Sequence, residues 1–229
     1  MLTGRGVAGQ TKTLRLRFEF CIPLQRIDSF SFFPFVCGKG GFFVQKISKA
    51  VAIGNLKNVK VISVMALFAA ISVIAGKYLA IPVGEYMRFS FENLPIILSG
   101  IVFGPICGLI TGVVADIVGC VLVGYTINPI ITAGAALIGF LSGFIFRIFQ
   151  TTKIVAPLSF ALLSAHIFGS VLLKSLGLSI YLGMPFEVTV IWRCLNYFIV
   201  SIAEFCVLFI LLKNKGFNNQ ILRITGGKI

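Results

Sequence analysis

The sequence predicts an all-α integral membrane protein, a bundle of six transmembrane helices with both termini on the cytoplasmic side. Of its 229 residues, 58% are hydrophobic and only 12% are charged, whereas soluble domains carry roughly 25% charged residues. Several apolar runs reach about 20 residues, the length that a helix needs to cross a hydrocarbon core about 30 Å thick. Backbone polar groups in lipid must pair internally, so these runs are expected to be helices.

The first stretch of the chain, residues 1–57, is basic and rich in Phe, with a period of neither 3.6 nor 2 residues. It lacks an apolar run followed by a small-residue cleavage site, so we do not predict a signal peptide. We expect little order here: the stretch is either a surface-lying leader or the product of a start codon placed too far upstream. The membrane domain is predicted over residues 58–213, followed by a basic cytoplasmic tail over 214–229.

Six apolar segments follow one another, separated by Gly, Pro and polar residues. They are predicted at residues 59–81, 93–103, 106–123, 130–149, 154–173 and 188–212. The second segment is short, and a turn-rich stretch is expected between the fifth and the sixth, over residues 174–187.

The distribution of Lys and Arg predicts the orientation in the membrane. Ten of the twenty lie in residues 1–60 and four lie after residue 212. With six crossings, the cations before the first segment, between the fourth and fifth, and after the sixth share one face, which should be cytoplasmic. The loops at 82–92, 124–129 and 174–187 then lie on the outer face. The net charge of +13 therefore indicates basic ends beside anionic lipid rather than a nucleic-acid partner.

Small residues recur at helical spacing within the segments. Gly100, Gly104, Gly108 and Gly112 follow one another every four residues, and Gly139 and Gly143 repeat the spacing. Such residues let helix backbones approach closely in lipid, so they predict helix packing.

The first segment carries Ala66 and Ala70 with the same spacing, and Ala69 beside them. These alanines indicate either internal packing or a docking face for another membrane subunit, and the spacing does not distinguish the two.

Catalytic motifs are missing from the sequence. The sole histidine, His166, has no acidic or Cys neighbour and is more often a hydrogen-bonded packing residue, and the six cysteines lack metal-site spacing. We predict no enzyme, no metal and no cofactor. There is also no phosphate-binding loop for ATP, so uphill transport would need a partner protein or an ion gradient.

Ionisable residues in or beside the spans are the candidates for function, because they are costly in a membrane. Asp116 and Glu204 lie within segments, and Glu204 could pair inside the bundle or face a partner. The other candidates gather toward the outer face, although Lys174 and Arg193 could merely reach the headgroups. The predicted ligand-binding set is Arg88, Phe91, Glu92, Asn93, Asp116, Tyr125, Asn128, Lys174, Trp192 and Arg193.

One stretch carries a family resemblance. It runs Arg88-Phe-Ser-Phe-Glu-Asn-Leu-Pro-Ile-Ile-Leu-Ser-Gly and continues through Gly112-Val-Val-Ala to Asp116. This pattern, over residues 60–213, resembles the substrate-binding S components of energy-coupling factor (ECF) vitamin transporters, and the folate branch matches best. The spacing of Ala66 and Ala70 is similar to the alanine motif by which S components dock on their transmembrane coupling subunit.

The resemblance implies the function and the partners. It implies capture of a vitamin, folate in this branch, at the outer face of a bacterial plasma membrane, with a coupling subunit and two ABC ATPases as partners. A pterin ring would lie among aromatic and amide groups with Asp116 accepting its hydrogen bonds, while Arg88, Lys174 and Arg193 would meet the carboxylates. Two alternatives stay open: an S component for thiamine, riboflavin or pantothenate, or a gradient-driven carrier that uses Asp116 and Glu204.

Overall fold

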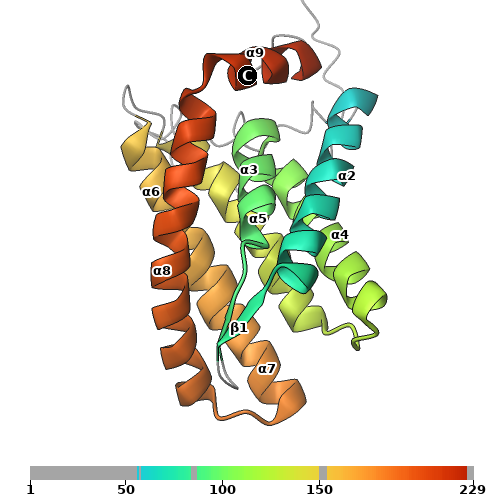
Figure 1. The fold of residues 1–229 in the computed structure, drawn as a ribbon, viewed down its shortest axis with the longest axis vertical. Coiled ribbons are helices and arrows are strands. Elements are labelled where there is room, and N and C mark those ends of the chain that lie inside the picture. The colour runs from blue at the N-terminus through green and yellow to red at the C-terminus, as the bar shows by residue number, and fades with distance from the viewer. Residues whose placement is uncertain (1–55, 57, 84–86, 150–153, 226–229) are drawn as a thin grey trace, which may run out of the picture. The chain divides into compact units, whose positions relative to one another are not determined.

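The computed structural model describes residues 56, 58–83, 87–149 and 154–225. Most of residues 1–57, on which the predicted leader falls, therefore lies outside the described part. The helices are α2 (Val59–Val73), η2 (Ile74–Tyr78), α3 (Asn93–Phe103), α4 (Pro105–Val123), α5 (Pro129–Ile148), α6 (Val155–Ser164), η3 (Ala165–Leu173), α7 (Lys174–Leu182), α8 (Phe186–Lys213) and α9 (Lys215–Thr225). The segments η2 and η3 are π-helical turns that continue α2 and α6 without a break (Figure 1).

Five helices of the described part are long and apolar enough to cross a membrane. They are Val59–Tyr78, Pro105–Val123, Pro129–Ile148, Val155–Tyr181 and Phe186–Lys213. The prediction of a helical membrane bundle is confirmed. The second predicted segment, α3, is an apolar helix of 11 residues and thus spans only about 16 Å.

The fifth segment differs from the prediction, because the chain stays helical from Val155 to Leu182. Ser and Gly after residue 174 indicated turns, yet Ser175 and Gly177 are buried. A Cβ atom on Gly177 would lie 2.8 Å from Cγ1 of Ile131 on α5. The helix ends only at Gly183, whose positive φ of 65° suits glycine. The predicted turn-rich stretch was wrong because close packing on α5 favours the helix.

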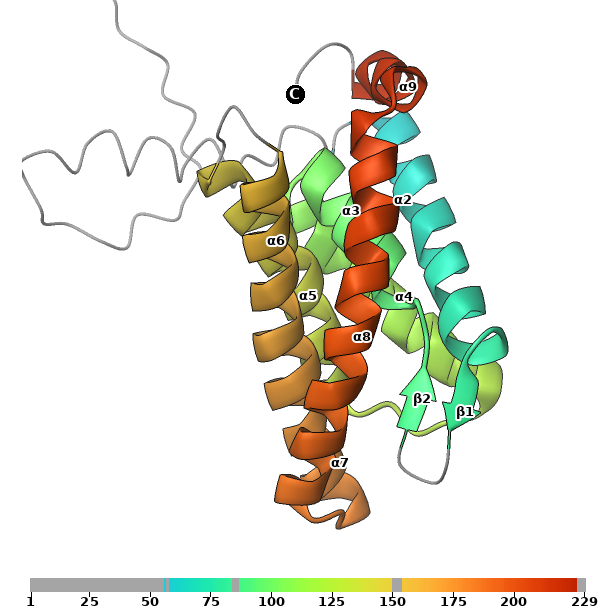
Figure 2. The same cartoon turned by 60° about the vertical axis from the view of Figure 1, so that its left-hand side comes forward.

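The predicted loop after the first segment contains a β-hairpin. Strands β1 (Ile81–Val83) and β2 (Met87–Phe89) pair antiparallel, with Ile81 opposite Phe89. Figure 2 shows the hairpin beside the lower part of α8. It returns the chain to the start of α3, where the hydroxyl of Ser72 donates a 2.6 Å hydrogen bond to the carbonyl of Glu92.

Helices α3, α4 and α5 meet through glycines. A Cβ atom on Gly108 would collide with the carbonyl oxygen of Gly139, and one on Gly143 would lie 2.9 Å from the backbone nitrogen of Pro105. The backbones therefore touch directly, as small residues allow in lipid. The predicted packing role is confirmed for the glycines within the helices, whereas Gly104 lies between α3 and α4 with a φ of 115°.

The end of the chain forms a helix that the sequence analysis did not predict. Helix α9 lies across one end of the bundle (Figure 1) and buries Ile221 and Thr225. The side chain of Asn58 donates a 2.7 Å hydrogen bond to the carbonyl of Ile224. This contact joins α9 to the start of α2, so residues 215–225 belong to the folded bundle.

Candidate ligand-binding site

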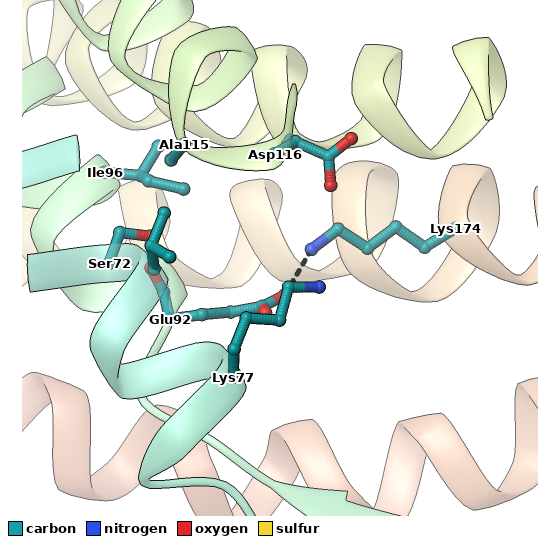
Figure 3. Close-up of a pocket in the computed structure, with 9 residues that line it drawn as sticks. Ser72, Lys77, Glu92, Ile96, Ala115, Asp116 and Lys174 are labelled. Carbon is teal, nitrogen blue, oxygen red and sulfur yellow. Dashed lines mark hydrogen bonds and ion pairs between the residues drawn. The ribbon is translucent and has the colours of Figure 1, made fainter. Parts of the chain in front are cut away.

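A cavity opens where η2, the start of α3, the second half of α4, the first half of α5 and α7 come together (Figure 3). Its open space is about 270 Å³, part of which connects with the outside. The lining combines four ionisable side chains with small and apolar ones. The lining residues are Ser72, Val73, Lys77, Glu92, Ile96, Ala115, Asp116, Ala135 and Lys174.

The centre of this cavity is an ion pair. Nζ of Lys174 donates to Oε1 of Glu92 at 2.6 Å, and the two side chains are 6% and 26% exposed. Because the helix continues past residue 173, Lys174 lies against the bundle rather than in a loop. Gly76 in η2 leaves room for the carboxylate, since a Cβ atom there would lie 2.6 Å from Oε2 of Glu92.

Glu92 lies outside the five spanning helices, and its surroundings lower its pKa from 4.5 to about 2. Burial alone would raise this pKa, because it disfavours the charged form. The charge of Lys174 and its hydrogen bond outweigh the burial, with further help from Lys77 and Arg193. The side chain of Glu92 is therefore ionised at physiological pH.

Asp116 and Lys77 bring a second pair of charges to the cavity. Oδ2 of Asp116 accepts a 2.6 Å hydrogen bond from the hydroxyl of Thr132, which ties α4 to α5. Nζ of Lys77 lies 5.6 Å from the ring centroid of Tyr125, within cation–π range. Two lysines thus face two acids, so the cavity offers donors and acceptors with no excess formal charge. Such a lining suits a polar ligand with both kinds of group.

Three of the residues predicted from the sequence line the cavity together: Glu92, Asp116 and Lys174. Asn93 is fully buried beside them, and its Nδ2 donates to the hydroxyl of Ser170 at 3.3 Å. Nη1 of Arg193 donates to the carbonyl of the same Ser170 at 3.0 Å.

The other predicted residues are not among the described residues that line the cavity. Asn128 caps α5, accepting from the backbone of Ile130 and donating to the carbonyl of Gly177, so its amide is used by the fold. Trp192 is 39% exposed, and the side chains of Phe91 and Tyr125 are also exposed. Arg88 is in β2, and its side chain is outside the described part.

Lys77 is the main lining residue that sequence reasoning left out. It is a lone cation near the end of a long apolar segment. Because a charge in a membrane is energetically costly, its presence there was a usable signal of function. Ser72, Ile96, Ala115 and Ala135 carried no such signal, because they resemble ordinary packing residues. Only the helix arrangement identifies them.

The candidate docking alanines separate into two groups. Ala66 and Ala70 are exposed on one side of α2, whereas Ala69 is buried in the core. The pair with four-residue spacing therefore lies on an outer surface, and Ala69 packs inside.

Metal ligands do not gather in the part of the chain that the structure describes. No three His, Cys, Asp or Glu side chains there lie close enough together to hold a metal ion.

Comparison with known proteins decides the family. The family described as "ECF transporter, substrate-specific component" matches residues 60–213. The chain belongs to the substrate-specific component family of ECF transporters. The predicted resemblance to S components is thereby confirmed.

Two solved structures are similar to this S component. One is described as FolT bound with folic acid, with 25% identity, a TM-score of 0.56, and coverage of 66% of this chain and 91% of that one. The other is described as the S component of a bacterial ECF transporter, with 18% identity, a TM-score of 0.46, and coverage of 68% and 98%. Curated protein sequences contain no significant match.

Proposed function

We propose that this S component captures folate with high affinity and delivers it to an ECF-type importer. The observation that carries the proposal is the similarity to the folic-acid-bound FolT, which extends over 91% of that chain. The lining of the cavity supports it. A pterin ring presents N–H donors and ring acceptors side by side, and Asp116, Glu92 and the two lysines offer the complementary groups.

The binding mode follows from the size and charge of the cavity. The space of about 270 Å³ includes open solvent, so its enclosed part is well below the roughly 300 Å³ of an ordinary ligand pocket. We assign this space to the ring end of the vitamin, with Asp116 accepting from ring N–H groups. The glutamate end, which carries the carboxylates, would extend toward the exposed side, with Lys77 as the candidate cation.

The proposed arrangement in the membrane has six crossings, with α3 as the short one. Lys60 is at the start of α2 and Lys213 at the end of α8, and these two helix ends lie beside α9 (Figure 1), whereas the cavity is lined from the opposite end of α2 and from η2. The positive end is cytoplasmic by the charge rule, which places the cavity near the outer leaflet of a bacterial plasma membrane. Both ends of the described chain are then cytoplasmic.

The proposed partners are a transmembrane coupling subunit and two ABC ATPases, which supply the energy. We assign the docking contact to the exposed face of α2 that carries Ala66 and Ala70. Small exposed residues let a partner helix approach the backbone closely.

The test is calorimetric titration of the purified, detergent-solubilised chain with folate, thiamine, riboflavin and pantothenate. Trp192 fluorescence is a second readout, although this residue does not line the cavity. The titration is expected to show tight binding of folate and no comparable binding of the other three vitamins. Tight binding of another of the four would keep the family and reject folate. No binding to folded protein would reject vitamin capture and favour a gradient-driven carrier.

A further inference from the structure

A buried acid–histidine pair lies in the bundle outside the cavity. Glu204, in the second half of α8, is 0% exposed, and its Oε2 lies 2.7 Å from Nε2 of His166 on η3. The imidazole also stacks on Tyr197 with ring centroids 5.1 Å apart. A buried acid in a membrane helix is costly, so such residues are functional candidates.

Polar contacts continue from this pair to the start of α3. Nδ1 of His166 lies 3.5 Å from the hydroxyl of Ser170, and that oxygen lies 3.3 Å from Nδ2 of Asn93. Ser170 and Asn93 are each 0% exposed. Four buried side chains are therefore linked in series, from Glu204 on α8 to Asn93, the residue that follows Glu92.

The acceptor character of a carboxylate sets the donor-to-acceptor direction of this series of hydrogen bonds. Oε2 of Glu204 pairs with Nε2 of His166, and with the proton on Nε2 the other ring nitrogen, Nδ1, is left as an acceptor. Ser170 then donates to Nδ1 and accepts from the amide nitrogen of Asn93. The amide oxygen Oδ1 of Asn93, which has no hydrogen-bond partner among the described residues, is held as an acceptor.

The helix that carries Ser170 also carries the cavity residue Lys174. Lys174, which pairs with Glu92, follows Ser170 by four residues, so the helix containing η3 and α7 holds two consecutive residues at the start of α3. Any shift of Asn93 thus also moves the carboxylate at the centre of the cavity.

We infer that Glu204 and His166 are positioning residues for vitamin binding, which act through Ser170 to orient Asn93 and the adjoining Glu92. The inference rests on the proposed function. A role limited to packing predicts that substitutions here change stability alone, whereas positioning predicts a change in affinity transmitted through Ser170.

The test is calorimetry with folate on Glu204→Met, which removes both carboxylate oxygens, on Ser170→Ala and on the double variant, with Glu187→Gln as the control. Glu187 is an exposed acid on the same helix. Each single variant should bind about tenfold more weakly, the effect of one lost hydrogen bond. The double variant should be no weaker than either single one, because both interrupt one chain. Glu187→Gln should bind like the wild type.

Unchanged affinity in both single variants, or losses that add in the double variant, would overturn the inference. If Glu204→Met does not fold, Ser170→Ala decides alone, since it removes only a hydroxyl and keeps the carbonyl that accepts from Arg193. A wild type that binds none of the four vitamins would overturn the proposed function and this inference with it. Wild-type binding that survives both substitutions would overturn the inference alone.

Discussion

Helices α3, α4 and α5 form a close backbone contact in one region and line the cavity in another. Toward Gly100, Gly108 and Gly139, the backbones touch, and there is no space for a Cβ atom. One to two turns away, Ile96, Asp116 and Ala135 line an open cavity instead. The same three helices thus supply a closed contact and an open site.

The difference shows how the bundle keeps a cavity in its interior. Direct backbone contact between α4 and α5 continues as far as Gly112 and Ala135, and the cavity opens beside this contact, where Asp116 and the other charged side chains lie. Lys174 and Glu92 place an ion pair there rather than packing atoms. Stability and ligand binding should accordingly respond to mutation at different positions of the same helices.

The largest expected effect comes from closing the space at the glycine end. Gly139→Val would drive a side chain into the carbonyl of Gly108 and should cost at least about 3 kcal/mol of folding free energy. Thermal unfolding and size-exclusion chromatography in detergent measure this loss. Ala133→Val, at an exposed position of the same helix, is the control and should unfold like the wild type. A fully stable Gly139→Val variant would contradict the close contact.

The next effect tests the ion pair in the cavity. Lys174→Met leaves the half-buried carboxylate of Glu92 without its partner, which should cost up to about 3 kcal/mol and abolish measurable folate binding. Adding Glu92→Gln should recover most of the melting temperature but not the binding. Lys60→Met, at an exposed cation, is the control. Recovery of binding in the double variant would show that the pair only stabilises the fold.

Asp116→Asn tests the ligand acceptor separately from the fold. The new amide can still accept from Thr132 through its oxygen, so the melting temperature should change little. Folate affinity should fall about tenfold to a hundredfold, because the charge-assisted acceptor is lost. Calorimetry measures the affinity, and an Asp116→Asn variant that binds normally would place the ring elsewhere.

The alanines of α2 compare a surface with the core on one helix. Ala66→Leu should leave folate binding and melting unchanged, yet prevent co-purification with the coupling subunit. Ala69→Leu, at a buried position, should lower the melting temperature by several degrees, since it overpacks the core. Equal behaviour of the two variants would argue against the docking face.

The smallest effect concerns pH. The pKa of Glu92 is about 2 in the fold and 4.5 as a free group, so its charge stabilises the fold fully above pH 4.5 and less as pH falls toward 2. The stability difference between the wild type and Glu92→Gln should stay constant from pH 8 to 5 and shrink below that range. Unfolding in detergent at several pH values measures it, and a difference that shrinks between pH 8 and 6 would contradict the lowered pKa.

Some of the site was predictable from the sequence because a charge in an apolar segment is conspicuous. Asp116, Glu92 and Lys174 stood out in this way and line the cavity. Lys77 carried the same signal, whereas Trp192 and Asn128 were included for their position and do not line it. The helix that continues past residue 173 could not be predicted, because the Ser and Gly residues there indicate turns unless their contacts with α5 are known.

Hydropathy, glycine spacing and motif are local properties of the chain, so they suffice for the membrane class, for most of the helical segments and for the family. Which charges meet, in contrast, depends on the tertiary structure. Glu92 and Lys174 are 82 residues apart, and His166 and Glu204 are 38 apart. Such pairs depend on how helices rotate and cross, and that follows from many weak packing contacts rather than from any single stretch of sequence.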